Sequence, residues 1–120
     1  MQRFRVGPDA ALTPGDGFLS RVTVSPITPS IVSGVPVQAA IFRIAAHGGF
    51  LRHPAGVPQI LIVLSGSGEV SGGDGHFESV VEGDAVFWAA GEEHETKSDP
   101  GMTVLIVEGH GVVPFLSGQR

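Results

Sequence analysis

The stretch Gly83–His94, GDAVFWAAGEEH, decides the fold of this chain. Its opening Gly-Asp pair is typical of a turn, and the apolar run from Ala85 to Trp88 is typical of a strand. Gly91 then permits a tight reversal, because a positive φ costs glycine nothing. The pattern therefore predicts a strand, a constrained turn and His94 at the start of the next strand.

The rest of the chain repeats this alternation of short apolar runs and glycine-rich turns. The 18 glycines and 9 prolines make up more than a fifth of the 120 residues, and no segment keeps helical apolar spacing beyond about two turns. Glycines 66 and 68 are expected to turn the chain, and strands recur at spacings of roughly eight to twelve residues, as in an all-β sandwich or barrel. The predicted strands are residues 2–6, 19–24, 37–45, 59–65, 69–71, 76–81, 84–89, 93–97 and 102–108.

The length fits a single domain, residues 1–120, and is too short for two independent cores. The barrel core is expected over residues 37–108, with N-terminal strands within residues 2–24 packed on it or on a partner. Residues 60–64 and 102–107 are apolar on both faces, although successive side chains of a strand point to opposite faces. Because only 16% of the residues are charged, we expect a homodimer to cover these outer faces; a second layer of the same chain is the alternative.

Composition argues against several classes of protein. The net charge is −5 and no Lys/Arg cluster occurs, so we expect no binding to nucleic-acid phosphates. No apolar run approaches the roughly 20 residues that a membrane helix needs, and Met1–Val6 lacks the apolar core of a signal peptide. We therefore expect a cytoplasmic protein that does not bind membranes.

A second stretch, Arg52–Gly66, RHPAGVPQILIVLSG, places polar residues on both sides of a loop. His53 precedes this proline-containing loop, and Gln59 opens the next strand. A polar residue before a turn and one after it can point into one cavity. His94 can converge with them there, so we expect two imidazoles about forty positions apart to meet inside the same barrel.

These two stretches resemble the paired motifs of the cupin superfamily. The second motif of that family is G-x5-P-x-G-x2-H-x3-N. Gly83, Gly91 and His94 match it at the right spacing, whereas Ala89 replaces the proline and Ser98 replaces the asparagine.

The first motif of the family, G-x5-H-x-H-x3or4-E-x6-G, is matched less fully. Gly66 matches its last glycine, and Gln59 stands at the position of the glutamate. If His53 is the second histidine of the motif, Leu51 occupies the first position. If His53 is the first, Ala55 occupies the second, and the usual spacing is restored. In either alignment one histidine is missing.

The resemblance covers roughly Val37 to Glu108 and implies an antiparallel β-barrel of the cupin type, a double-stranded β-helix or jelly roll, often dimeric. It also implies a divalent metal, typically held by three histidines and one glutamate. The candidate metal ligands here are His53, Gln59 and His94, for Zn, Fe, Ni, Mn or Cu. Trp88 joins them as a candidate ligand-binding residue, because it or its neighbour Phe87 should line the barrel.

Each candidate also has a plainer interpretation. His94 can hydrogen-bond within the cavity without a metal, His53 can reach solvent, and Gln59 can fix the loop before it. The other histidines, His47, His76 and His110, lie in or beside glycine-rich turns and are expected at the surface.

The function that follows is a small cupin that binds a small organic ligand in the barrel beside a degenerate metal site. Such a protein is either a metal-dependent dioxygenase, isomerase or cyclase, or a metal-free binding or sensor module without catalysis. A structural role, with a vestigial cavity and apolar strands that mediate assembly, is a third interpretation. The sequence alone leaves open whether the protein is an enzyme.

Overall fold

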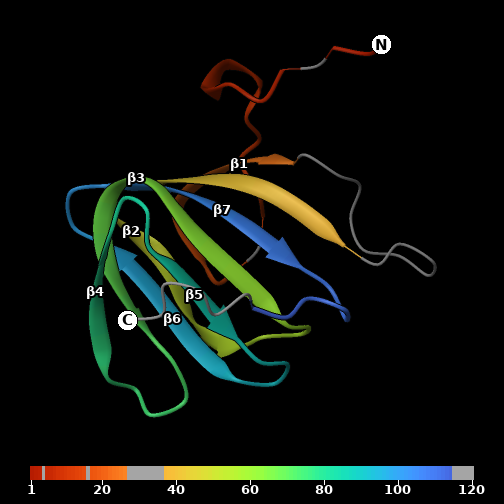
Figure 1. The fold of residues 1–120 in the computed structure, drawn as a ribbon. Coiled ribbons are helices and arrows are strands. Elements are labelled where there is room, and N and C mark those ends of the chain that lie inside the picture. The colour runs from red at the N-terminus through yellow and green to blue at the C-terminus, as the bar shows by residue number, and fades with distance from the viewer. Residues whose placement is uncertain (4, 16, 27–36, 115–120) are drawn as a thin grey trace.

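The computed structural model describes residues 1–3, 5–15, 17–26 and 37–114 (Figure 1). In these ranges the chain forms one turn of 3-10 helix and seven strands. They are η1 (Pro8–Ala10), β1 (Leu19–Pro26), β2 (Gln38–Pro54), β3 (Gln59–Ser71), β4 (Phe77–Val81), β5 (Ala85–Trp88), β6 (Glu93–Ser98) and β7 (Met102–Glu108).

The strands close into an antiparallel barrel. β2 and β3 are long, and each pairs with β7 in its first half and with β6 in its second half. The ladder thus runs from β2 to β7, to β3, to β6 and back to β2. β1 extends the sheet beside β2, whereas β5 and β4 pair with the first and second halves of β3 (Figure 1). The all-β barrel predicted from the sequence is confirmed.

Glycines 66 and 68 do not end a strand, contrary to the prediction. β3 continues through them and shifts register between Val63 and Ser65. Gly66 has a φ of 81°, and a Cβ there would overlap the carbonyl oxygen of Gly101. The glycine therefore bends a continuous strand and carries β3 from its pairing with β7 to its pairing with β6.

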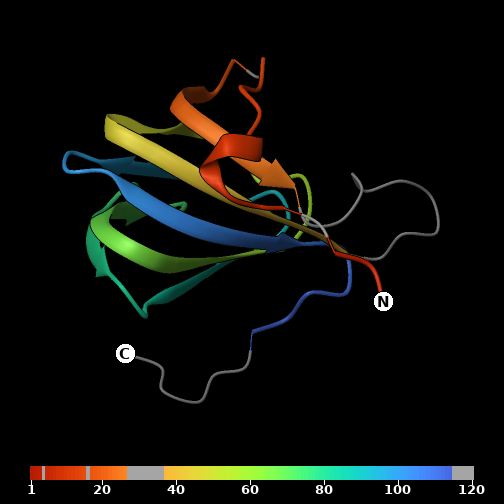
Figure 2. The same ribbon diagram turned by 90° about the horizontal axis from the view of Figure 1, so that it is seen from above.

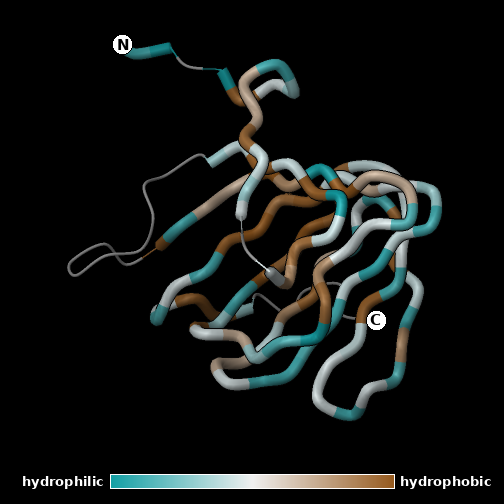
Figure 3. The backbone as a smooth tube through the Cα atoms, turned by 180° about the vertical axis from the view of Figure 1, so that it is seen from behind, coloured by the Kyte–Doolittle hydropathy of each residue, from teal (hydrophilic) through white to brown (hydrophobic). Residues whose placement is uncertain are grey.

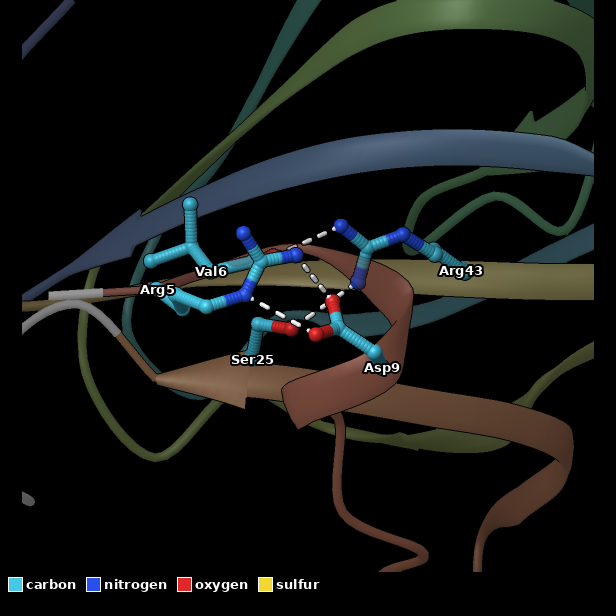
Figure 4. A network of polar contacts seen from close by, with 5 residues as sticks. All are labelled: Arg5, Val6, Asp9, Ser25 and Arg43. Carbon is cyan, nitrogen blue, oxygen red and sulfur yellow. Dashed lines mark hydrogen bonds and ion pairs between the residues drawn. The ribbon is translucent and has the colours of Figure 1, made fainter.

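The predicted N-terminal strand over residues 2–6 is wrong, because the described residues of this range belong to no strand. This segment instead leads into η1, which lies outside the barrel over β1 and β2 (Figure 2). Polar contacts hold it there (Figure 4): Arg43 of β2 donates to the carbonyl oxygen of Val6 at 2.8 Å and to Ser25 Oγ at 2.9 Å, and Arg5 pairs with Asp9. The guanidinium of Arg5 also lowers the pKa of the Asp9 carboxyl. The predicted strand 19–24 is confirmed as β1.

Alternation along β3 and β7 separates the interior of the barrel from its outside. Hydrophobic residues follow the strands and hydrophilic ones gather at the turns (Figure 3). The outward side chains of Ile60, Ile62, Leu105 and Val107 are half-exposed. Both strands are therefore apolar on two faces, as predicted, and the homodimer stays a prediction. The buried cluster inside consists of Val22, Ile44, Phe50, Leu61, Val63, Val70, Val80, Trp88, Met102, Val104 and Ile106.

Over the described ranges, no helix has both the length and the apolar character needed to cross a membrane.

Candidate functional site

One end of the barrel carries a layer of polar and aromatic side chains. In the ladder, Glu108 of β7 lies opposite Gln59 of β3, and Gln59 lies opposite Trp88 of β5. Two positions further along, on the same faces of β7 and β3, stand the buried Ile106 and Leu61. The polar layer therefore lies on an apolar floor.

His53 and His94 meet in this layer, as the sequence predicts. They are directly paired across the ladder between β2 and β6, and their ring centroids are 4.3 Å apart. His94 is fully buried, with 0% of its surface exposed, whereas His53 is half-buried. The two strands thus bring together imidazoles that are 41 positions apart in the sequence.

The two imidazoles are the middle of a row of four rings. Phe18 stacks on His53 with centroids 4.1 Å apart, and Trp88 stacks on His94 at 4.6 Å. Phe18 directly precedes β1, and its carbonyl oxygen accepts a hydrogen bond of 2.7 Å from the backbone N–H of Leu51. Sequence reasoning missed Phe18, because the loop before β1 carries no motif that links it to the histidines. The row fixes both imidazole planes, with the partly exposed Phe18 covering His53.

Hydrogen bonds define the tautomer of both histidines. Nδ1 of His53 lies 2.7 Å from the carbonyl oxygen of Leu51, and Nδ1 of His94 lies 3.2 Å from that of Glu92. Because a carbonyl can only accept, each Nδ1 must carry the proton and donate it. In the neutral form of each imidazole the lone pair therefore lies on Nε2. Histidines that bind metals usually donate their other ring N–H in this way.

Burial also keeps His94 neutral. Desolvation lowers the pKa of His94, the hydrogen bond to the Glu92 carbonyl opposes this shift, and the nearby His53 adds to the lowering. At neutral pH the ring is therefore an uncharged acceptor at Nε2, which is the form that binds a metal.

Gln59 lines the interior, as predicted, and pairs with a residue that the sequence analysis missed. Its Nε2 donates to Oε2 of Glu108 at 2.9 Å. The signal for Glu108 was present, because it shares its face of β7 with the buried Val104 and Ile106. The pairing of β7 with β3, which brings it to Gln59, depends on tertiary structure.

Three buried polar atoms inside the barrel have no hydrogen-bond partner among the residues that the structure describes. They are Oε1 of Gln59, Nε2 of His94 and Oγ1 of Thr96, and we call them the interior polar atoms. Thr96 is 1% exposed and lies two positions after His94 on the same face of β6. Since buried polar groups are nearly always hydrogen-bonded, these atoms need partners such as buried water, an ion or a polar ligand.

The predicted ligands have donor atoms of the kinds that bind transition metals. Within the described parts of the chain, no group of three or more His, Cys, Asp or Glu side chains could hold a metal. The predicted set nevertheless has two imidazoles with free lone pairs on Nε2, and a buried amide oxygen on Gln59. Three protein donors with further positions open are typical of catalytic zinc. All three donors are neutral, so none of them offsets the charge of a dication.

The structure also distinguishes the two alignments of the first cupin motif. Leu51 is 52% exposed, whereas Ala55 is 4% exposed. The backbone of Ala55 is tied to the turn before His94, with its N–H donating to Glu92 at 2.9 Å and its carbonyl accepting from Gly91 at 2.7 Å. His53 is therefore the first histidine of the motif, and Ala55 stands where the second would be.

The surface predictions for the remaining histidines are confirmed. His47, His76 and His110 are all exposed. Trp88 lines the interior while Phe87 faces outward and is half-buried, so the predicted division between these neighbours also holds.

A groove of about 490 Å³ lies elsewhere on the molecule. Its walls come from residues 13–14, from β1 and from β2, and they include Arg21 and Arg43. None of the four predicted site residues lines it. The four residues predicted from the sequence therefore lie outside this groove, at the barrel end beneath Phe18.

Comparison with known proteins supports the resemblance of the motifs. The chain is 32% identical over 115 residues to the (R)-mandelonitrile lyase of Granulicella tundricola. The aligned region covers 90% of this chain and 84% of that protein. No family model matches.

Solved structures share the fold. The polyketide cyclase RemF from Streptomyces resistomycificus superposes with a TM-score of 0.77 at 21% identity, over 95% of this chain and 82% of that one. A cupin 2 conserved barrel domain protein from Salinispora arenicola gives a TM-score of 0.70 at 18% identity, over 89% of this chain and 87% of that one. With its barrel, its two motif stretches and its curated relative, the chain belongs to the cupin superfamily.

Proposed function

We propose that the protein is a metal-dependent lyase acting on a small hydroxylated organic substrate at the barrel end beneath Phe18. His53 and His94, through Nε2, and Gln59, through Oε1, are the proposed metal ligands. The observation that carries this proposal is the contact between the two imidazoles, both anchored through Nδ1 so that Nε2 is free. A histidine kept only for packing has no need of this shared arrangement.

A divalent metal held by these residues would act as a Lewis acid toward an oxygen of the substrate. The protein supplies orientation and exclusion of water. Trp88 and the apolar floor of Leu61 and Ile106 suit the hydrocarbon part of a ligand, since small-molecule sites are mostly apolar with few polar groups. Phe18 stacks on His53 and Trp88 stacks on His94, and these contacts hold the two imidazoles in place.

The choice of a lyase follows from the curated relative. Its name describes cleavage of (R)-mandelonitrile, an aromatic cyanohydrin that yields benzaldehyde and hydrogen cyanide, and the similarity extends over nearly the whole chain. The polyketide cyclase is a more distant neighbour and supports the fold alone. An aromatic cyanohydrin combines a hydroxyl, which a metal can bind, with a ring that suits an apolar floor.

Metal binding and cleavage are tested together on purified protein stripped with a chelator. Zinc and manganese are titrated by calorimetry, and release of benzaldehyde from (R)-mandelonitrile is followed by absorbance with and without metal. We expect binding and cleavage in the native chain and loss of both in His94→Ala. The matched control is His76→Ala, which removes an exposed imidazole from a turn and is expected to change neither.

The second candidate is a metal-free binding module. It is favoured by Ala55 at the position of a motif histidine and by the neutral amide of Gln59 at that of the glutamate. In this case calorimetry detects no zinc or manganese, whereas an aromatic alcohol still binds and changes the fluorescence of Trp88, the only tryptophan in the sequence. That pair of results would rule out the lyase.

A further inference from the structure

Glu108 lies directly opposite Gln59 in the pairing of β3 with β7, so a carboxylate contacts one of the proposed metal ligands. We infer that Glu108 is a positioning residue: it fixes the amide of Gln59 with its oxygen toward the barrel interior, and supplies through that hydrogen bond the negative charge that Gln59 lacks. This inference rests on the proposed metal site and concerns how that site is tuned. It does not make Glu108 a metal ligand.

The orientation follows from hydrogen-bond chemistry. Gln59 and Glu108 are directly opposed in the pairing of β3 with β7, and Nε2 of Gln59 lies 2.9 Å from Oε2 of Glu108. An ionised carboxylate only accepts hydrogen bonds, so the amide must turn its NH2 group toward Glu108. The amide oxygen then has to point away from Glu108, and the structure buries it as one of the interior polar atoms.

The opposite orientation of the amide is disfavoured where it meets Glu108, and it does not suit a bound cation. It would bring the amide oxygen against the carboxylate of Glu108 and forfeit a charge-assisted hydrogen bond. It would also turn two N–H donors, instead of an acceptor, toward the barrel interior, where a bound cation needs acceptors. A cation bound by His53 and His94 would then face the positive end of the amide dipole. Glu108 therefore selects the orientation that can bind a metal.

Charge gives the pair a second role. His53, His94 and Gln59 are neutral donors, whereas the cupin motif has a glutamate at the position of Gln59. A carboxylate that accepts from the amide N–H polarises the amide and increases the negative charge on its oxygen, an effect that is stronger in the low dielectric of a barrel interior. Gln59 and Glu108 together can thus do part of what a single glutamate ligand does.

The test uses four forms of the full chain, all stripped with a chelator: the native protein, E108Q, Q59E, and the exchange Q59E/E108Q. Zinc affinity is measured by calorimetry. We expect E108Q to bind zinc about 10- to 100-fold more weakly, the usual loss when a partner of a metal ligand is removed. The amide at position 108 in E108Q can donate to Gln59, so both orientations of the Gln59 amide become available.

The exchange should restore binding at least to the native level. In Q59E/E108Q, an amide at position 108 donates to one oxygen of a carboxylate at position 59, and the second oxygen faces the interior. Q59E alone places two carboxylates opposite each other, where like charges repel. We therefore expect Q59E to bind zinc more weakly than the exchange. A residue with a purely structural role would not show this rescue.

A readout without metal accompanies the titrations. In the metal-free native protein, the side-chain NH2 signals of Gln59 in a nitrogen–proton NMR spectrum should show one strongly shifted, slowly exchanging proton that E108Q abolishes. Thermal unfolding of each variant shows that it is folded.

The inference is wrong if E108Q binds zinc as the native protein does while His94→Ala does not bind it. It is also wrong if the exchange fails to restore binding in a folded protein. If the native chain binds no zinc, the proposed metal site fails, and the charge-supplying role of Glu108 fails with it. The NMR signal then decides on the orientation of the amide alone.

Discussion

Replacing Ala55 by histidine is expected to tighten the binding of zinc by about 10- to 100-fold, an estimate that weighs an added donor against overpacking. The cupin motif has a second histidine that this chain lacks, and the structure assigns its position to Ala55. Ala55 is buried and bonded through its backbone to the turn that leads into His94. A side chain at position 55 therefore starts from the interior, two residues after His53.

The magnitude follows from the worth of one donor and the burial of the position. Structural zinc sites with four donors bind with about 10–16 kcal/mol at pH 7, or roughly 2.5–4 kcal/mol per donor. At about 1.4 kcal/mol per tenfold change, this is roughly a 60- to 700-fold gain. Adding bulk to a well-packed interior costs about 1–3 kcal/mol. If about 1 kcal/mol of this cost opposes binding, roughly 1.5–3 kcal/mol of the gain remains, which corresponds to about 10- to 100-fold.

Leu51→His is the matched comparison, because it makes the same addition at the rival position of the motif. Leu51 is largely exposed, so this variant should bind zinc as the native protein does. Affinity is measured by calorimetry, and quenching of Trp88 fluorescence by cobalt locates the ion beside His94. The reasoning is refuted if Leu51→His gains as much as Ala55→His, or if a folded Ala55→His gains nothing.

Three further predictions test the surroundings of the site. Phe18→Ala should leave the fold intact, because Phe18 lies partly exposed outside the core cluster. It should also speed the quenching of Trp88 by acrylamide, and an unchanged rate would show that Phe18 does not cover the site. In metal-free protein with chelator, the free energy of unfolding by urea should fall as the pH drops below about 6.5. The folded state, in which the pKa of His94 is lowered, then binds fewer protons than the unfolded state, so His94→Asn should flatten this dependence. Light scattering of the native protein should give the mass of a dimer. Leu105→Glu places a charge on the half-exposed outer face of β7 and should give a monomer. A monomeric native protein at micromolar concentration would contradict this prediction.

The fold was predictable from sequence because the barrel depends on short-range patterns. Strand periodicity and turn residues predicted most of the strands, and β5 with the turn to His94 agrees closely with the Gly83–His94 pattern. The course of β3 was not predictable, because a glycine at a turn and a glycine in a bent strand look alike in sequence. Only the close approach of Gly101 shows which of the two Gly66 is. The N-terminal residues alternate like a strand, yet they find no partner strand among the described residues.

The same contrast between sequence patterns and tertiary contacts separates the site residues that were predicted from those that were missed. Motif spacing predicted His53, Gln59 and His94, because the family pattern records which positions face the interior. Phe18 and Glu108 were missed, although both lie against those side chains in the structure. Neither belongs to a motif, and each reaches the site through a strand pairing or loop packing that joins distant parts of the chain. Residues that position a ligand are therefore harder to read from sequence than the ligands themselves.

The interior polar atoms are the strongest argument against a barrel kept only for assembly. A buried polar group left without any partner costs about 1–3 kcal/mol, so the interior polar atoms need partners such as buried water, an ion or a ligand. Apolar residues at the positions of His94, Gln59 and Thr96 would remove that cost. Such local conflicts with stability are expected at functional sites. The proposed binding role accounts for the buried, neutral imidazole of His94 and the unpartnered amide oxygen of Gln59, and an assembly role does not.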